Sequence, residues 1–168
     1  MPFDTNLSIT PSSADFDHSA LTNLEFVYEY STATLNVGNM PARGMAAVLD
    51  WGAADPVTLA SSVASSGDED LVTATFIVQH ANNDASGSLS ASTWEDLVSF
   101  SPRYAGDGKA EIATRRIQTP RPHLRTAVRW NNANVAAGKD LAGNCDVGEP
   151  VLYIGDWDYD HTDGGNIT

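Results

Sequence analysis

The chain has 168 residues, with 22 Asp and Glu against nine Lys and Arg, and its formal net charge is −13 with the histidines neutral. This length fits one domain that can bury roughly 70% of its extended-chain surface without metals or disulfides, and the negative charge repels nucleic acid phosphates, so we expect no nucleic-acid partner. The longest apolar runs are far shorter than the ~20 residues that cross a bilayer, so we expect no membrane partner, and the single cysteine excludes an internal disulfide.

The first 23 residues have no hydrophobic period and are rich in Ser, Asp, Asn, Thr and Pro. This composition predicts an extended N-terminal arm that is either mobile or laid on a neighbouring molecule. Apolar residues recur along the arm at a spacing that suits anchors in an extended chain. We expect these anchors to contact another protein or a sister subunit, and they are Phe3, Leu7, Ile9 and Phe16.

Four segments in the first half of the chain have strand-like sequences. Leu24–Tyr30 alternates apolar and polar residues at a period of two, which is typical of a half-buried strand. Thr32–Val37 and Met45–Trp51 are shorter, and the second could instead form a short helix. Leu71–His80 is loaded with β-branched and aromatic residues and is the clearest strand of the four.

The second half contains four more candidate strands, Thr93–Phe100, Ala110–Ile117, Pro122–Trp130 and Val147–Ile154. Turn-forming residues separate them, and no segment has a convincing amphipathic helical period. About eight short strands of this kind predict an all-β fold, a single-domain antiparallel β-sandwich or jelly roll.

The predicted organisation has three parts. Residues 1–23 are the arm, residues 24–155 the β-sandwich domain, and residues 156–168 an acidic C-terminal tail.

Positive charge is concentrated in one stretch of the chain. Arg103–Lys139 contains eight Lys or Arg and two acids, a net charge of +6, whereas the remaining residues carry one Arg and twenty acids, a net charge of −19. A solvated strand face with weak surface ion pairs would explain the arginines, as would a docking surface. Because Lys is scarce and six of seven arginines gather here, we favour docking, with Arg115, Arg116, Arg121, Arg125 and Arg129 as candidate interface residues.

Within Pro122–Trp130 the alternation separates two faces. One face is expected to enter a core and carries Leu124, Thr126, Val128 and Trp130. The other is expected to make contacts and carries His123, Arg125, Ala127 and Arg129.

No arrangement typical of catalysis is present. The chain lacks a G-x-S-x-G elbow, a phosphate-binding glycine loop and an H-E-x-x-H motif, and its four histidines share no ligand spacing. We therefore expect no enzymatic activity and no cofactor.

The C-terminal run GDWDYDHTDGG is the one segment that resembles a metal site. Asp156, Asp158 and Asp160 have the alternate spacing of calcium ligands, but the required Gly and bidentate Glu are replaced by His161 and Ile167. A solvated acidic edge explains the three aspartates equally well. We expect no metal, and calcium stays open as an alternative.

The order of three segments resembles a known family. Leu71–His80 is followed by a polar loop and Thr93–Phe100, and then by PHLRTAVRWNNANVAAG, residues 122–138. This order is similar to that of the jelly-roll cement, or decoration, proteins that coat the capsids of some tailed phages. The resemblance covers roughly residues 44–138, and the N-terminal arm and the acidic tail have no counterpart in it.

The family typically has a late strand in which an aromatic-aliphatic-Arg triplet leads into a Gly-containing turn. Leu124 and Arg125 match the triplet and Gly138 follows the strand, but His123 stands where the family usually has an aromatic residue. The resemblance implies a viral structural protein without enzymatic activity that binds the outer surface of the major capsid protein shell and stabilises it. It further implies a homo-oligomer, dimer or trimer, located on the virion and, during assembly, in the host cytoplasm.

Two other classes remain open. A carbohydrate- or receptor-binding β-sandwich of a phage tail or a secreted protein would need an exposed aromatic platform, for which Trp51, Trp94, Trp157 and Tyr159 are available. An enzyme on a jelly-roll barrel would require a metal-binding group of histidines, which the scattered histidines do not supply.

Overall fold

The computed structural model describes the parts of the chain that form the sheets and several connections between them: residues 8–12, 16, 18–21, 26–38, 45–50, 58–59, 73–104, 113–117, 120–131, 141–146 and 151–156. Nearly all of the regular structure in these ranges is β, apart from a single 3-10 turn, Ala91–Thr93. None of the described residues forms a helix long and apolar enough to cross a membrane.

Thirteen strands follow one another along the described chain. They are β1 (Ser8–Ile9), β2 (His18–Leu21), β3 (Phe26–Tyr30), β4 (Leu35–Asn36), β5 (Met45–Asp50), β6 (Thr58–Leu59), β7 (Thr73–Ala81), β8 (Glu95–Ser99), β9 (Arg103–Tyr104), β10 (Ala113–Ile117), β11 (His123–Asn131), β12 (Leu141–Asp146) and β13 (Val151–Asp156).

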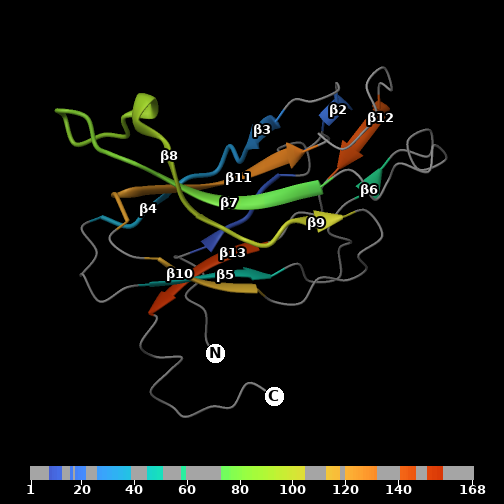
Figure 1. The fold of residues 1–168 in the computed structure, drawn as a ribbon. Coiled ribbons are helices and arrows are strands. Elements are labelled where there is room, and N and C mark those ends of the chain that lie inside the picture. Colours follow the sequence, from blue (N-terminus) through green and yellow to red (C-terminus); the bar gives the residue numbers. More distant parts are fainter. Residues whose placement is uncertain are drawn as a thin grey trace, which may run out of the picture.

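The strands form three antiparallel sheets (Figure 1). The large sheet has the order β3-β11-β7-β8, with β4 also paired to β11 and β9 to β7. The small sheet has the order β1-β13-β5-β10 and lies across from the large sheet as a second layer. A third sheet, β2-β12-β6, lies toward the end of the large sheet where β11 finishes.

The main core fills the space between the two layers. In β7, Ala74, Phe76 and Val78 point into it, because residues at a spacing of two share one face of a strand. The other core residues on strands come from both sheets and are Ile9, Ala47, Leu49, Ile117, Leu124, Val128, Trp130, Leu152 and Ile154, and Phe16 and Phe100 join the core from outside the strands. Two antiparallel sheets with a shared apolar core confirm the predicted β-sandwich.

The two-faced reading of Pro122–Trp130 is correct for the core side, where all four predicted residues are buried. The opposite face needs a correction, because His123 and Ala127 are buried as well, and only Arg125 and Arg129 are partly exposed. The cause lies in the position of β11, which has β7 on one side and β3 and β4 on the other. A central strand has neighbours on both sides that cover its small and short side chains.

Of the segment Met45–Trp51, for which strand and helix were both open, the described residues Met45–Asp50 form strand β5. It pairs with β10 on one side and β13 on the other, and Ala46, Ala47, Val48 and Leu49 are all buried. Burial on both faces removes the alternation by which a strand is usually recognised.

The N-terminal segment differs most clearly from the extended arm that the sequence predicted. Ser8–Ile9 pairs with β13 as an edge of the small sheet, and Ile9 is only 1% exposed. Phe16 is equally buried and meets Phe76 edge to face at 5.5 Å between ring centroids. His18–Leu21 pairs with β12. These parts of the expected arm therefore belong to the sheets and the core. Ile9 and Phe16 bury their apolar side chains there, but the many polar residues around them give the segment the overall composition of a polar arm.

Other parts of the expected organisation lie outside the described residues. These are Phe3 and Leu7 of the arm and residues 157–168 of the acidic tail, which include two of the three aspartates of the calcium alternative. The third, Asp156, is the last residue of β13, so the sandwich reaches one residue into the segment assigned to the tail.

Candidate interaction surface

The outer face of the large sheet, opposite the core, carries a row of polar side chains across three strands. Arg125 of β11 lies directly opposite Gln79 of β7, and Gln79 lies opposite Asp96 of β8. On the other side of β11, Ala127 pairs with Tyr30 of β3. The register thus places an arginine, an amide and a carboxylate side by side, with a tyrosine at the flank.

Arg125 is stacked between aromatic rings. Its guanidinium carbon lies 3.9 Å from the ring centroid of Tyr30 and 4.4 Å from that of Trp94. Tyr28 stacks on Tyr30 with a centroid distance of 6.2 Å and an interplanar angle of 18°. We call these four residues the Arg125 stack. Cation–π contacts of this kind contribute from about 0.5 kcal/mol to about 2 kcal/mol as they become desolvated.

The register fixes the order within the stack. Tyr28 is paired with Arg129 and Tyr30 with Ala127, so Arg125 is the next position in the same direction along β11. Tyr28 and Arg125 consequently lie on opposite sides of the Tyr30 ring. Both faces of that ring are occupied, although Tyr30 is 40% exposed and is the exposed large hydrophobic residue of the described chain.

Gln79 fixes the Arg125 guanidinium through its side-chain amide. The Arg125 Nε–H donates to Gln79 Oε1 at 2.9 Å, and Gln79 Nε2 donates to Asp96 Oδ1 at 2.7 Å. The two bonds set the orientation of the Gln79 amide, because its oxygen must accept and its nitrogen must donate. Burial lowers the pKa of Arg125, and Tyr30 acts in the opposite direction. An arginine keeps its positive charge in proteins nonetheless.

The stack also explains buried residues on an outward face. Ile77 and Ala127 point away from the main core yet are almost fully buried, and they lie opposite one another in adjacent strands. The positions around them in register carry Tyr30, Arg125 and Arg129, whose rings and long aliphatic stems can cover apolar surface.

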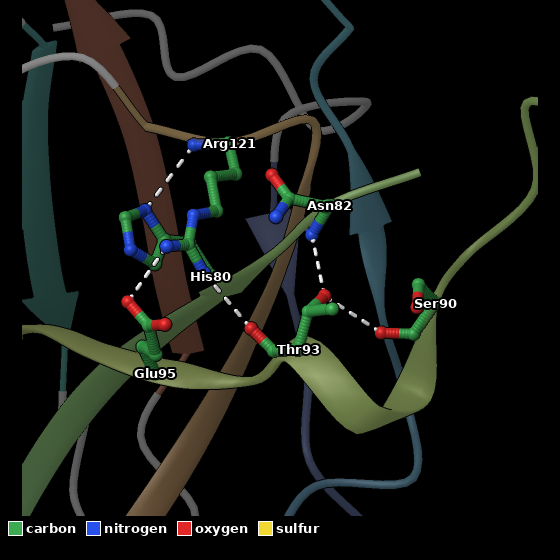
Figure 2. Close-up of polar contacts among 6 residues, drawn as sticks. All are labelled: His80, Asn82, Ser90, Thr93, Glu95 and Arg121. Atoms are coloured by element: carbon green, nitrogen blue, oxygen red, sulfur yellow. Dashed lines mark hydrogen bonds and ion pairs between the residues drawn. The ribbon is translucent and has the colours of Figure 1, made fainter. Parts of the chain in front are cut away.

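A second cluster, the Arg121 clamp, joins the start of β11 to the segment before β8 (Figure 2). The Arg121 backbone N–H donates to His80 Nδ1 at 3.2 Å. Its guanidinium donates to the Thr93 carbonyl at 2.9 Å through Nη1 and to Glu95 Oε2 at 2.7 Å through Nη2. Trp94 lies between Thr93 and Glu95 in the chain, so the clamp binds the backbone carbonyl before Trp94 and the side-chain carboxylate after it.

Thr93 fixes the same segment from its other side (Figure 2). Its Oγ1 accepts from the Asn82 backbone N–H at 2.8 Å and donates to the Ser90 carbonyl at 2.8 Å. The Ser90 N–H in turn donates to the Asn82 carbonyl at 2.9 Å. These bonds close the loop between β7 and β8 at its base.

Asp84 organises the tip of this loop. Its Oδ1 accepts from the backbone N–H groups of Ser86 and Ser88 and from the Ser86 hydroxyl, at 2.6 to 2.9 Å. These bonds, led by that of the Ser86 hydroxyl, lower the pKa of the carboxyl. The turn requires Gly87 at a φ of +84°, which other residues rarely adopt.

The clamp perturbs the titration of His80. Burial lowers the pKa of His80 from its ordinary value of 6.5, the positive charge of Arg121 lowers it further, and Glu95 raises it. His123 is engaged at the same end of the sheet, where its Nε2 donates to Asn83 Oδ1 at 2.7 Å. This contact explains why His123 is buried rather than presented to a partner.

The arginines that are neighbours in sequence divide between two sheets. Arg115 and Arg116 lie on β10 of the small sheet, opposite Ala47 and Ala46, and their side chains are outside the described set. Arg121, Arg125 and Arg129 lie at or on β11 of the large sheet. The structure therefore does not unite the five predicted interface residues in one cluster.

The sequence analysis overlooked the aromatic part of this surface. The alternation of Leu24–Tyr30 places Tyr28 and Tyr30 on one face, but it does not show that this face points outward beside Arg125. For Trp94 the sequence suggested only an aromatic platform for a sugar. Tyr30 and Arg125 are 95 positions apart, and no local pattern reports a contact of that range.

Two findings bear on other functions. Within the described part of the chain, no three His, Cys, Asp or Glu side chains converge as metal ligands. Comparisons of the whole chain with protein-family models, curated proteins and solved structures give no match.

Proposed function

We propose that this protein is a non-enzymatic capsid cement protein that docks on the outer surface of a major capsid protein shell through the outer face of its large sheet. The observation that carries the docking surface is the Arg125 stack, in which the guanidinium lies over the rings of Tyr30 and Trp94 on the outer face of the large sheet. The cement role itself rests on the order of segments described for the sequence. In this role the protein acts on the virion as a dimer or trimer.

The composition of the stack supports a protein partner. Tyr, Trp and Arg are the residue types most enriched among the hot spots of protein interfaces. Here all three occur within one contact group, and Gln79 and Asp96 already fix the cation. Groups that are ordered before binding lose less conformational entropy when a partner arrives, which leaves more of the contact energy for affinity.

The carbohydrate-binding alternative fits this surface less well. A sugar stacks on the free face of an aromatic ring, but Tyr28 and Arg125 occupy the two faces of Tyr30. Arg125 also occupies one face of Trp94. The Tyr30 ring is therefore taken by neighbouring side chains, and the surface offers guanidinium nitrogens, which suit the side chains of another protein.

The test is cosedimentation of the full chain with a capsid shell. The proposal predicts that a major capsid protein gene lies beside the gene for this chain, and the shell is assembled from that protein. Arg125→Ala and Arg129→Ala are expected to weaken binding strongly, since removing a buried charged contact at an interface typically costs about 2–5 kcal/mol. The melting temperature of the free protein should fall less than binding does, because both residues are partly exposed. Arg125→Ala also removes the contacts with Tyr30, Trp94 and Gln79, so an equal loss of fold stability and binding would assign these arginines to the sandwich.

Thr34→Ala, at an exposed position between β3 and β4, is the matched control and should bind like the unchanged protein. Shell binding that is indifferent to both arginine variants would refute docking through this face. Saturable binding on a glycan array, with no binding to the shell, would favour the carbohydrate alternative.

A further inference from the structure

Arg125 is held in one orientation, but its hydrogen-bonding capacity is not exhausted. Nε donates to Gln79, and the guanidinium carbon lies over the rings of Tyr30 and Trp94. A guanidinium has five N–H donors, and four of them are on the two Nη atoms. Within the described ranges no hydrogen bond or ion pair engages either Nη atom of Arg125.

Arg121 shows what an arginine used for structure looks like in the same protein. Its two Nη atoms bind the Thr93 carbonyl and the Glu95 carboxylate, so its guanidinium is occupied. Asp96 is close enough to Arg125 to share a hydrogen-bonded partner, but it bonds the Nε2 of Gln79 instead of the cation. The acidic neighbour thus orients Arg125 through Gln79 and leaves the end of the guanidinium unneutralised.

We infer that the Nη edge of Arg125, walled by Tyr30 and Trp94, is a binding site for a carboxylate, the Asp or Glu side chain of the docking partner. The inference rests on the proposed function for the identity of the partner as a protein. Two parallel N–H groups match the two oxygens of a carboxylate, and such bidentate pairs are among the stronger hydrogen-bonded contacts in proteins.

The surroundings explain why a single carboxylate suits this site. The rings of Tyr30 and Trp94 cover part of the guanidinium, and this partial desolvation strengthens an electrostatic contact relative to bulk water. The rings can also pack against the aliphatic stem of a Glu side chain. A densely charged polyanion would instead meet the −13 charge of the whole chain and be repelled.

The test is an NMR titration of the full-length, ¹⁵N-labelled protein with N-acetyl-glutamate amide. The matched probe is N-acetyl-glutamine amide, which has the same shape without the charge. We expect a saturable shift of the Arg125 Nε–Hε and Trp94 indole N–H signals with the glutamate probe. The glutamine probe should bind at least about tenfold more weakly, a difference that corresponds to about 1.4 kcal/mol.

Two variants separate the site from general electrostatics. Arg125→Lys keeps the charge but removes the planar fork, so it should lose at least about tenfold of the affinity for the glutamate probe. Asp96→Asn keeps an acceptor for Gln79 and removes a nearby negative charge, so it should tighten binding. Because Asp96 is exposed, this second variant keeps the test valid if Arg125→Lys fails to fold.

Equal binding of the two probes, or no shift of the Arg125 signal, would overturn the inference. Tighter binding of inorganic phosphate than of the glutamate probe would overturn the assignment to a protein carboxylate. Failure of the capsid assay with an intact glutamate site would refute the proposed function and leave this site standing. Capsid binding that survives Arg125→Lys unchanged would refute the carboxylate site and leave the proposed function standing.

Discussion

At the scale of single residues, two arginines four positions apart have different tasks. Both Nη atoms of Arg121 bind groups within the protein. Arg125 is oriented by the hydrogen bond from its Nε to Gln79, and its Nη edge stays available. The two are linked through Trp94, because the clamp fixes the backbone around the residue whose ring covers Arg125. Replacing Arg121 should therefore alter the geometry of the Arg125 stack, although Arg121 is not part of that stack.

Replacement of Arg121 by Gln should lower the free energy of unfolding by about 1–2 kcal/mol. A surface ion pair contributes about 0–1 kcal/mol and a hydrogen bond about 1 kcal/mol. Glu95 is 61% exposed, so Glu95→Gln should cost less than Arg121→Gln, and urea unfolding of both variants measures the difference. The Trp94 indole signal should broaden or shift in Arg121→Gln, and an unchanged signal would argue against a positioning role.

The stability of the fold should depend on pH through His80. Its pKa is lowered in the folded protein, so the unfolded chain takes up a proton first as the pH falls. The contribution of His80 to the free energy of unfolding is therefore complete above pH 6.5 and is lost as the pH falls from there through the lowered pKa of His80. In His80→Asn, whose side-chain oxygen can still accept from the Arg121 N–H, this part of the pH dependence should disappear. Equal slopes of unfolding free energy against pH in both proteins would contradict the assignment.

At the scale of the elements, short edge strands complete the sandwich. The small sheet ends at β1, which contains only Ser8–Ile9, and its one core side chain is that of Ile9. The strand fills the edge beside β13 and covers one side of the main core. Its contribution is packing more than backbone pairing.

Truncating Ile9 to Ala should destabilise the free protein by about 2–4 kcal/mol, and Ile9→Val by about 0.5–1.5 kcal/mol, as is usual for buried isoleucines. Chemical unfolding of the isolated chain measures both. An anchor that packs only on another protein would leave the isolated chain unaffected. The graded loss therefore distinguishes a core residue from an arm residue.

The sequence predicted the long central strands and missed the short ones for a physical reason. Leu71–His80 and Pro122–Trp130 correspond to β7 and β11, where nine residues are enough to display a period of two and a bias to β-branched side chains. Strands of two residues, such as β1, β6 and β9, contain no period at all. The glycine-containing β12 has weak strand propensity and was missed as well.

The candidate site was predictable only in part. Alternation in β11 correctly placed Arg125 and Arg129 away from the core. Their aromatic neighbours come from β3 and from the turn before β8, which are brought together by the register of four strands. Register depends on pairing across the whole sheet, so residues near one another in sequence do not encode it.

At the scale of the whole molecule, the charge distribution sets how the protein responds to salt. A net charge of −13 on a chain of this size creates repulsion between acidic groups that opposes the compact state. The cationic stretch Arg103–Lys139 offsets part of this charge, and the arginines of β10 and β11 lie on the small and the large sheet respectively.

Raising the ionic strength from about 0.01 M to about 0.15 M shortens the Debye length from about 30 Å to about 8 Å. The melting temperature should therefore rise over this range, and scanning calorimetry in NaCl would record it. A fall in the melting temperature would mean that attractive ion pairs contribute more to stability than the repulsion between acidic groups removes. At matched ionic strength, a larger rise with CaCl₂ than with NaCl would support calcium binding by the C-terminal aspartates.

The pairing of β1 with β13 also sets an order of events for synthesis on the ribosome. Strand β1 is synthesised long before its partner β13, which is at positions 151–156 and separates β1 from β5 in the sheet. Until those residues emerge, the nascent chain holds two strand segments with open edges, the state in which unpaired strands add to other chains. Completion of the small sheet is thus a late event, and a chain terminated before residue 151 should be recovered mainly as aggregate.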